Sequence, residues 1–119
     1  MKNFRDLEVW KRAHNLTLEV YRATEKFPKH ELYGLTSQMR RASSSIAANI
    51  AEGCGKKTEA DFARYLQNAF GSASELEYFL LLSFDLGLLP KPEYERLTGD
   101  TIEIKKMLAA FIQTLHAER

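Results

Sequence analysis

The segment Gly53-Cys-Gly-Lys-Lys-Thr58 contains the residue types that most resemble a known chemical site. A phosphate-binding loop has the pattern Gly-x-x-x-x-Gly-Lys-Ser/Thr after a β-strand, so that backbone N–H groups and the lysine hold the phosphates. Here Ile50 stands at the first glycine position, and Lys57 stands where a hydroxyl residue should follow Lys56. The segment therefore predicts a turn with solvated lysines, not a nucleotide site.

Other residue types that often carry catalysis lack suitable partners. His14, His30 and His116 do not have the Glu-x-x-His spacing that a di-iron helical bundle uses. Cys54 has no histidine nearby in the sequence, and no base is placed to activate the serines at positions 43–45. We therefore expect a protein that is not an enzyme, with no metal ligand and no cofactor.

Five basic side chains form the remaining candidate site. They are Arg40, Arg41, Lys56, Lys57 and Arg64. If they lie together, they can contact the phosphates of RNA or DNA, and such contacts depend on salt and carry no sequence information. In the alternative interpretation, one of the arginines pairs with a carboxylate and the other basic side chains are simply solvated.

Four amphipathic helical patterns must position these residues. They span about residues 6–26, 35–55, 58–86 and 92–115, and apolar residues recur in them every three or four positions. No segment alternates apolar and polar residues as a strand would. The connections are short, which favours antiparallel neighbours. The sequence predicts an all-α fold with a single domain over residues 1–119, an antiparallel up-down-up-down four-helix bundle.

Turn and capping residues set the expected ends of the second and third helices. Thr58 and Asp61 resemble a capping box, with the aspartate in place of the usual glutamate. Gly53 and Gly55 are the residues best able to adopt the left-handed conformation that often ends a helix. We therefore expect the second helix to end at these glycines and the third to begin at Thr58.

Pairing these two helices about their turn predicts a polar contact. Arg40 then lies opposite Gly71, and Glu75 falls within one turn of Arg41. We expect Glu75 to form a partly buried ion pair or hydrogen bond with Arg40 or Arg41, and the spacing alone leaves either arginine open. Because desolvation offsets much of the attraction, the pair would fix the helix register more than it would add stability.

The helix over residues 35–55 is unusually rich in small side chains, so neighbours can approach it on more than one side. The second half of the third helix is apolar nearly all round and needs cover on several sides. A contact with another copy of the chain would bury both surfaces, and a ring arises when such contacts close by rotation. The expected oligomer interface comprises Ser43, Ala47, Tyr78, Leu81 and Phe84.

The composition agrees with a cytoplasmic domain and excludes some partners. The 119 residues carry 17 Lys and Arg against 16 Asp and Glu, a net charge of +1, so binding of nucleic acid must come from a local patch. The single cysteine excludes an internal disulfide and fits a reducing compartment. The N-terminus has no uninterrupted apolar region, and no apolar run reaches the ~20 residues of a membrane span.

The order of several motifs resembles the bacterial 23S rRNA intervening-sequence protein family, whose members are four-helix bundle proteins. The motifs are Phe4-x-x-Leu7-x-Val9-Trp10-x-x-Ala13, Phe27-Pro28-x-x-Glu31-x-x-Gly34-Leu35-x-x-Gln38-x-Arg40-Arg41-Ala42, Ser45-Ile46-x-x-Asn49-Ile50-Ala51-Glu52-Gly53 and Ala69-x-Gly71-Ser72-x-x-Glu75-Leu76.

This resemblance implies a protomer that assembles as a ring-shaped homopentamer, and a genomic association with insertions in ribosomal RNA genes. The family is similar to the accessory protein of diversity-generating retroelements, a pentameric barrel that binds nucleic acid and a reverse transcriptase. We therefore expect a homo-oligomeric protein associated with RNA or DNA. The alternative is an oligomeric scaffold or adaptor that binds a protein partner without nucleic acid.

Overall fold

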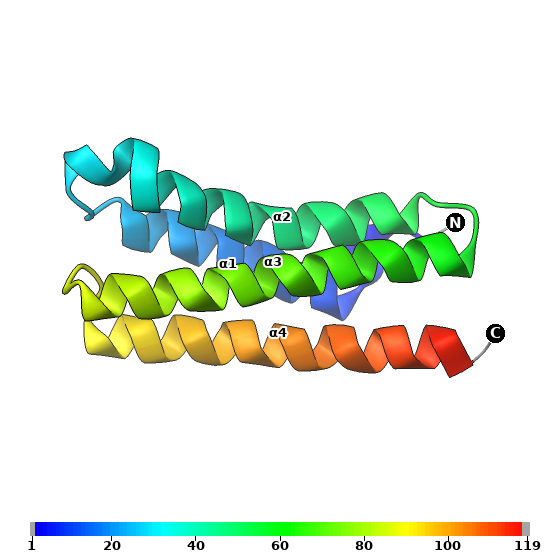
Figure 1. Cartoon of the computed structure of the whole chain (residues 1–119). Helices are drawn as coiled ribbons and strands as arrows, with labels where there is room; N and C mark the ends of the chain where they lie inside the picture. The colour runs from blue at the N-terminus through cyan, green and yellow to red at the C-terminus, as the bar shows by residue number, and fades with distance from the viewer. Residues whose placement is uncertain (1, 118–119) are drawn as a thin grey trace.

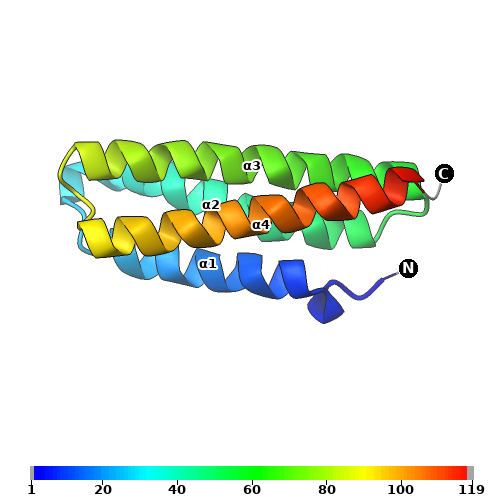
Figure 2. The same ribbon diagram turned by 90° about the horizontal axis from the view of Figure 1, so that it is seen from below.

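Four long helices follow one another along the chain in the computed structural model, which describes residues 2–117. They are α1 (Glu8–Thr24), α2 (Ser37–Cys54), α3 (Glu59–Asp85) and α4 (Lys91–Ala117). Consecutive helices run in opposite directions and pack against each other, and α1 also packs against α4 (Figures 1 and 2). No strand occurs within the described residues. The predicted all-α bundle is confirmed; residues 1 and 118–119 of the expected domain lie outside the described residues.

The apolar stripes read from the sequence form the core between the helices. On α3, seven residues spaced three or four positions apart are all buried: Phe62, Leu66, Ala69, Ala73, Leu76, Leu80 and Ser83. On α2, Met39, Ala42 and Ile46 are buried at the same spacing, but Asn49, at the next position of this stripe, is only half-buried, and its side-chain amide donates to the Ser45 carbonyl. Ile50 fills the core instead, because an apolar side chain is buried there without an unpaired polar group.

The connection between α1 and α2 contains two short helical segments, η2 (Lys29–Glu31) and η3 (Leu32–Thr36). The backbone bends at Gly34, whose φ and ψ of −111° and −112° are not helical. A Cβ atom at this position would lie 2.9 Å from Glu31 Oε1, and that same oxygen accepts a hydrogen bond from the Leu35 N–H at 3.1 Å. The bend thus delays the start of α2 to Ser37 and turns Tyr33 toward solvent.

The expected left-handed ending of α2 is wrong. Gly55, the residue after the helix, has φ −85°, and within residues 2–117 only Gly87 has a positive φ. Gly53 serves a packing role, because a Cβ atom there would lie 2.9 Å from both Phe62 Cδ1 and Tyr65 Cβ. The glycine permits the close approach of α2 and α3 beside their turn.

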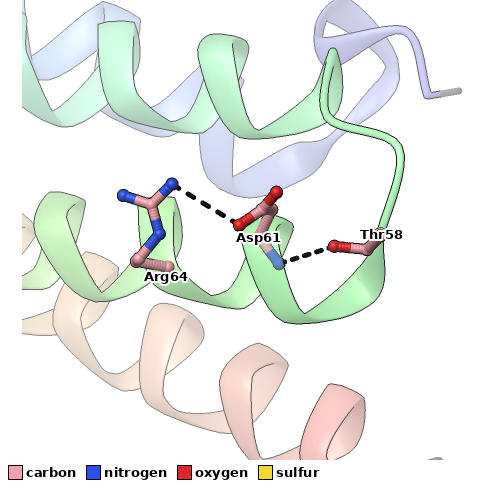
Figure 3. A network of polar contacts seen from close by, with 3 residues as sticks. All are labelled: Thr58, Asp61 and Arg64. Carbon is pink, nitrogen blue, oxygen red and sulfur yellow. Dashed lines mark hydrogen bonds and ion pairs between the residues drawn. The ribbon is translucent and has the colours of Figure 1, made fainter.

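The threonine half of the expected capping box on α3 is confirmed, whereas the Asp61 carboxylate makes no return hydrogen bond to the Thr58 N–H. Thr58 precedes the helix in an extended conformation, and its hydroxyl accepts a hydrogen bond from the Asp61 N–H at 3.1 Å. The Asp61 carboxylate turns to Arg64 Nη2, 3.5 Å away (Figure 3). A side chain that caps the first turn satisfies a backbone donor that the helix itself leaves unpaired.

None of the helices within residues 2–117 combines the length and the apolar character that a bilayer crossing requires.

Candidate nucleic-acid interface

The five predicted basic residues occupy two separate places on the bundle. Arg40 and Arg41 lie in the first turns of α2, next to η3, whereas Lys56 and Lys57 follow the other end of α2. About 20 Å of helix separates Arg41 from the end of α2, at 1.5 Å per residue. The expectation of a single basic patch is therefore wrong, because α2 runs along the bundle and separates Arg40 and Arg41 at one of its ends from the other basic residues near its other end (Figure 1).

Arg40 is held in place by α1. Its Nε atom donates to Thr24 Oγ1 at 2.9 Å, and its Nη2 atom donates to the Tyr21 carbonyl at 3.3 Å. The guanidinium lies 4.6 Å from the centroid of the Tyr21 ring. Thr24 is buried and donates its own hydroxyl hydrogen to the Val20 carbonyl at 2.8 Å. The Arg40 side chain is thus fixed before any ligand arrives.

The predicted contact of Glu75 with Arg40 or Arg41 is wrong. These three residues all lie in the described part of the chain, and Glu75 forms no hydrogen bond or ion pair with either arginine. Met39, the neighbour of Arg40, contacts Ser83 of α3 at 3.2 Å. Ser83 is eight residues beyond Glu75, which is about 12 Å along the helix, so Glu75 lies too far along α3 to face Arg40. Arg40 turns to α1, and Glu75 and Arg41 are exposed. The register between α2 and α3 differs from the one expected from the turn.

An open hollow of about 520 Å³ surrounds the two arginines, at the end of the bundle where η3 leads into α2. Two arginines, two tyrosines, one leucine and three hydroxyl-bearing residues line it, and no acidic residue does. The lining residues are Tyr21, Leu32, Tyr33, Thr36, Ser37, Arg40, Arg41 and Ser44. Glu25 lines a neighbouring cavity together with Arg40, but the lining of this hollow carries positive charge only, so the hollow favours an anionic ligand.

The other basic residues lie around the turn between α2 and α3. Lys56 Nζ lies 5.0 Å from the Tyr65 ring centroid and the Arg64 guanidinium 4.8 Å from it. Arg64 also contacts Asp61, and this carboxylate reduces the positive potential (Figure 3). The turn combines an aromatic ring with cations, as the hollow does, but its charges are partly compensated.

Cys54 lies buried beside this turn. Burial raises the pKa of the Cys54 thiol, and the positive charge of Lys2 lowers the pKa by a smaller amount. The thiol therefore stays protonated at neutral pH, and a thiol is a much weaker nucleophile than a thiolate. Within residues 2–117, no three His, Cys, Asp or Glu side chains lie close enough together to hold a metal ion.

The expected oligomer interface is only partly accessible on the protomer. Ser43 and Ala47 are 0% and 9% exposed and are covered by their own chain; Thr17 Oγ1 donates to the Ser43 carbonyl at 3.1 Å. The expectation that Ser43 and Ala47 belong to the oligomer interface is therefore wrong, because both are buried within the protomer and Ser43 lies against α1. Tyr78 and Leu81 remain 57% and 43% exposed on α3.

Phe84, the last residue of the expected interface, is half-buried and stacks on Tyr94 of α4, with ring centroids 4.5 Å apart.

Sequence reasoning missed Tyr33 and Leu32, the most exposed apolar side chains of the hollow. Both lie in the short connection after Pro28, outside every helical stripe. The signal that could have found them is the presence of two large apolar residues in a corner that offers no inward face. Apolar residues without a place in the core often mark a binding surface.

Comparisons with known proteins agree with the fold. The family model described as 23S rRNA-intervening sequence protein matches residues 5–110. A crystal structure of a protein with unknown function from the S23 ribosomal protein family of Bacteroides thetaiotaomicron VPI-5482 is similar, with a TM-score of 0.79 and 27% identity. The similarity covers 87% of this chain and 97% of that one. No curated protein is similar enough to count as a match.

Proposed function

This chain belongs to the 23S rRNA-intervening sequence protein family, and from this premise we propose that it is a non-enzymatic, homo-oligomeric cytoplasmic protein that binds RNA or DNA. The contacts are made with phosphates and do not depend on base sequence. Arg40 and Arg41 provide the principal contacts, and Lys56, Lys57 and Arg64 provide a second set at the opposite end of α2.

The observation that carries this proposal is the hollow with two guanidinium groups and no acidic lining residue. A guanidinium donates two parallel hydrogen bonds to a phosphate and remains charged at every physiological pH. Arg40 is already ordered by Thr24 and Tyr21, so less side-chain entropy is lost when a phosphate binds. Arg41 is exposed beside it and can complete the contact.

Assembly strengthens these contacts. We infer a homo-oligomer, a pentamer by the family resemblance, from the exposed apolar side chains Tyr78 and Leu81 on α3 and Leu86 just beyond it. Each protomer would repeat both basic clusters around the assembly. Several weak phosphate contacts on one strand then act together, because the second contact occurs at a high effective concentration.

Binding of a labelled RNA and a labelled DNA at two salt concentrations tests the proposal. Fluorescence anisotropy should show affinity that falls steeply as salt rises, with a slope reduced by about one in Arg41→Gln. Lys106→Gln, an exposed lysine on α4, removes the same charge and should leave the slope unchanged. Lack of binding to either nucleic acid at low salt would refute the proposed function.

A second candidate is an oligomeric adaptor that docks a protein. The exposed Tyr78, Leu81 and Leu86 favour it, because large apolar side chains are enriched at protein interfaces. A pull-down that recovers one specific protein after nuclease treatment, together with absent nucleic-acid binding, would support this candidate over the first.

A further inference from the structure

We propose that the hollow lined by Tyr21, Leu32, Tyr33, Arg40 and Arg41 binds an unpaired base, so that the protein prefers single-stranded RNA or DNA to a duplex. The base stacks on the ring of Tyr33 and the adjacent phosphate lies against Arg41. This inference rests on the proposed function and specifies the class of nucleic acid that this site takes.

Tyr33 is presented to solvent in an unusual way. Its side chain is 91% exposed, and its ring stacks on no other ring within residues 2–117. An aromatic side chain usually contributes by burying a large apolar surface, so an exposed one is available for a ligand. Base–aromatic stacking tolerates every base, because each base has a flat π-face.

The backbone that carries Tyr33 is anchored on both sides. Leu35 and Thr36 of η3 are buried, and the Glu31 carboxylate accepts the Leu35 N–H. The ring is therefore carried by a fixed turn rather than by a loose loop. Because this turn is already ordered, no backbone entropy is lost when a base stacks on the ring that it carries.

The positive charge of the hollow favours the phosphate that is linked to the base. Arg41 is exposed, and the Ser44 hydroxyl donates to the Arg41 carbonyl at 3.2 Å, so the lining on this side is a cation with hydroxyls around it. Arg40 lies over Tyr21 and adds a second, immobile positive charge. An aromatic face beside a guanidinium is the combination by which proteins hold single strands.

A duplex cannot use this combination. Its bases are stacked on one another, so only its phosphates could reach Arg41, while Tyr33 would remain in water. The geometry thus predicts that strand type changes the affinity, whereas phosphate contacts alone would bind both forms.

The test compares a short labelled single strand, as RNA and as DNA, with the blunt duplex of the same sequence. The wild-type protein should bind the single strand more tightly, and Tyr33→Ala should weaken that binding by about tenfold, which corresponds to one lost stacking contact. Tyr33→Phe keeps the ring and should bind as the wild type does. A base analogue whose fluorescence responds to stacking should change its emission with wild type and Tyr33→Phe only.

Three results would overturn the inference. The first is equal affinity for single strand and duplex while binding still depends on salt; the proposed function would then stand without this site. The second is unchanged binding by Tyr33→Ala, with its far-ultraviolet circular dichroism intact. The third is a change in the sedimenting mass of Tyr33→Ala, which would assign the ring to a contact between copies of the chain. Lack of any binding would refute both proposals together.

Discussion

At the scale of single residues, Thr24 determines where Arg40 points. Its buried hydroxyl donates to the Val20 carbonyl and accepts from Arg40 Nε, so one small side chain joins α1 to the cation of α2. Hydrogen bonds to a charged group contribute more than neutral ones, although the half-exposed guanidinium can regain water when the bond is lost. Thr24 therefore acts as a positioning residue for the hollow.

Replacing Thr24 by valine tests this role with little change in volume. We expect Thr24→Val to lower the free energy of unfolding by about 1 kcal/mol, measured by urea denaturation. In a double-mutant cycle with Arg40→Met, the two losses should be less than additive, because both changes remove the same hydrogen bond. Strictly additive losses would contradict a direct contribution of this pair.

Gly53 is a second residue whose role is set by its neighbours. Alanine normally stabilises a helix relative to glycine by about 0.5–1 kcal/mol, and Gly99→Ala in α4 should show this gain because a Cβ atom there meets nothing within 4 Å. Gly53→Ala should instead lose about 1–2 kcal/mol, since its Cβ atom meets Phe62 and Tyr65 at 2.9 Å. Opposite shifts of the urea midpoint for the two variants check this; equal shifts would contradict it.

At the scale of elements, the helices and their inner faces could be predicted from the sequence, because a 3.6-residue repeat leaves only one side of each helix for the core. The α3 cap could also be predicted, since a threonine before the helix has a local partner in the Asp61 N–H. The bend at Gly34 could not, because it depends on how Glu31 folds back onto Leu35.

Residues of the candidate site were predicted only in part, and the reason is register. The choice of basic residues follows from composition alone, but the contact of Met39 with Ser83 sets which part of α3 faces Arg40. Packing of two long helices decides this offset, and the turn between them does not. The packing of α2 on α1 likewise decides that Ser43 is buried, and this could not be inferred from the small size of the serine.

The N-terminus of α3 offers a test at this scale. Thr58→Ala removes the acceptor for the Asp61 N–H and should cost about 1 kcal/mol, whereas Thr58→Ser should cost little. Amide exchange at Asp61 should accelerate in the alanine variant, because its N–H is then bonded only to water and exchanges with it. If the serine variant loses as much as the alanine variant, the hydrogen bond is not the source of the stability.

At the scale of the whole molecule, the outer face of α3 carries large apolar side chains that the protomer does not cover. Tyr78 and Leu81 are more than two-fifths exposed, although the same helix buries every residue of its inner face. A stable contact between copies buries about 800 Å² on each partner, and aromatic side chains contribute most to such contacts. Assembly would explain why these side chains are apolar without any role in the protomer core.

The sedimenting mass tests this explanation. We expect the wild-type protein to sediment as an oligomer, and Tyr78→Ser combined with Leu81→Ser to shift the mass toward the 13.7 kDa of one chain. The bundle itself should keep its stability, because substitutions of exposed residues usually change it by less than about 0.5 kcal/mol. Leu18→Ser with Ile102→Ser, on α1 and α4, is the matched control and should leave the mass unchanged. A wild-type chain that sediments as a monomer, or a control pair that dissociates the oligomer while the α3 pair does not, would show that the α3 face is not the interface. If the wild-type chain is a monomer, the basic clusters of several copies cannot act together, and the affinity for a long strand should be close to that for a short one.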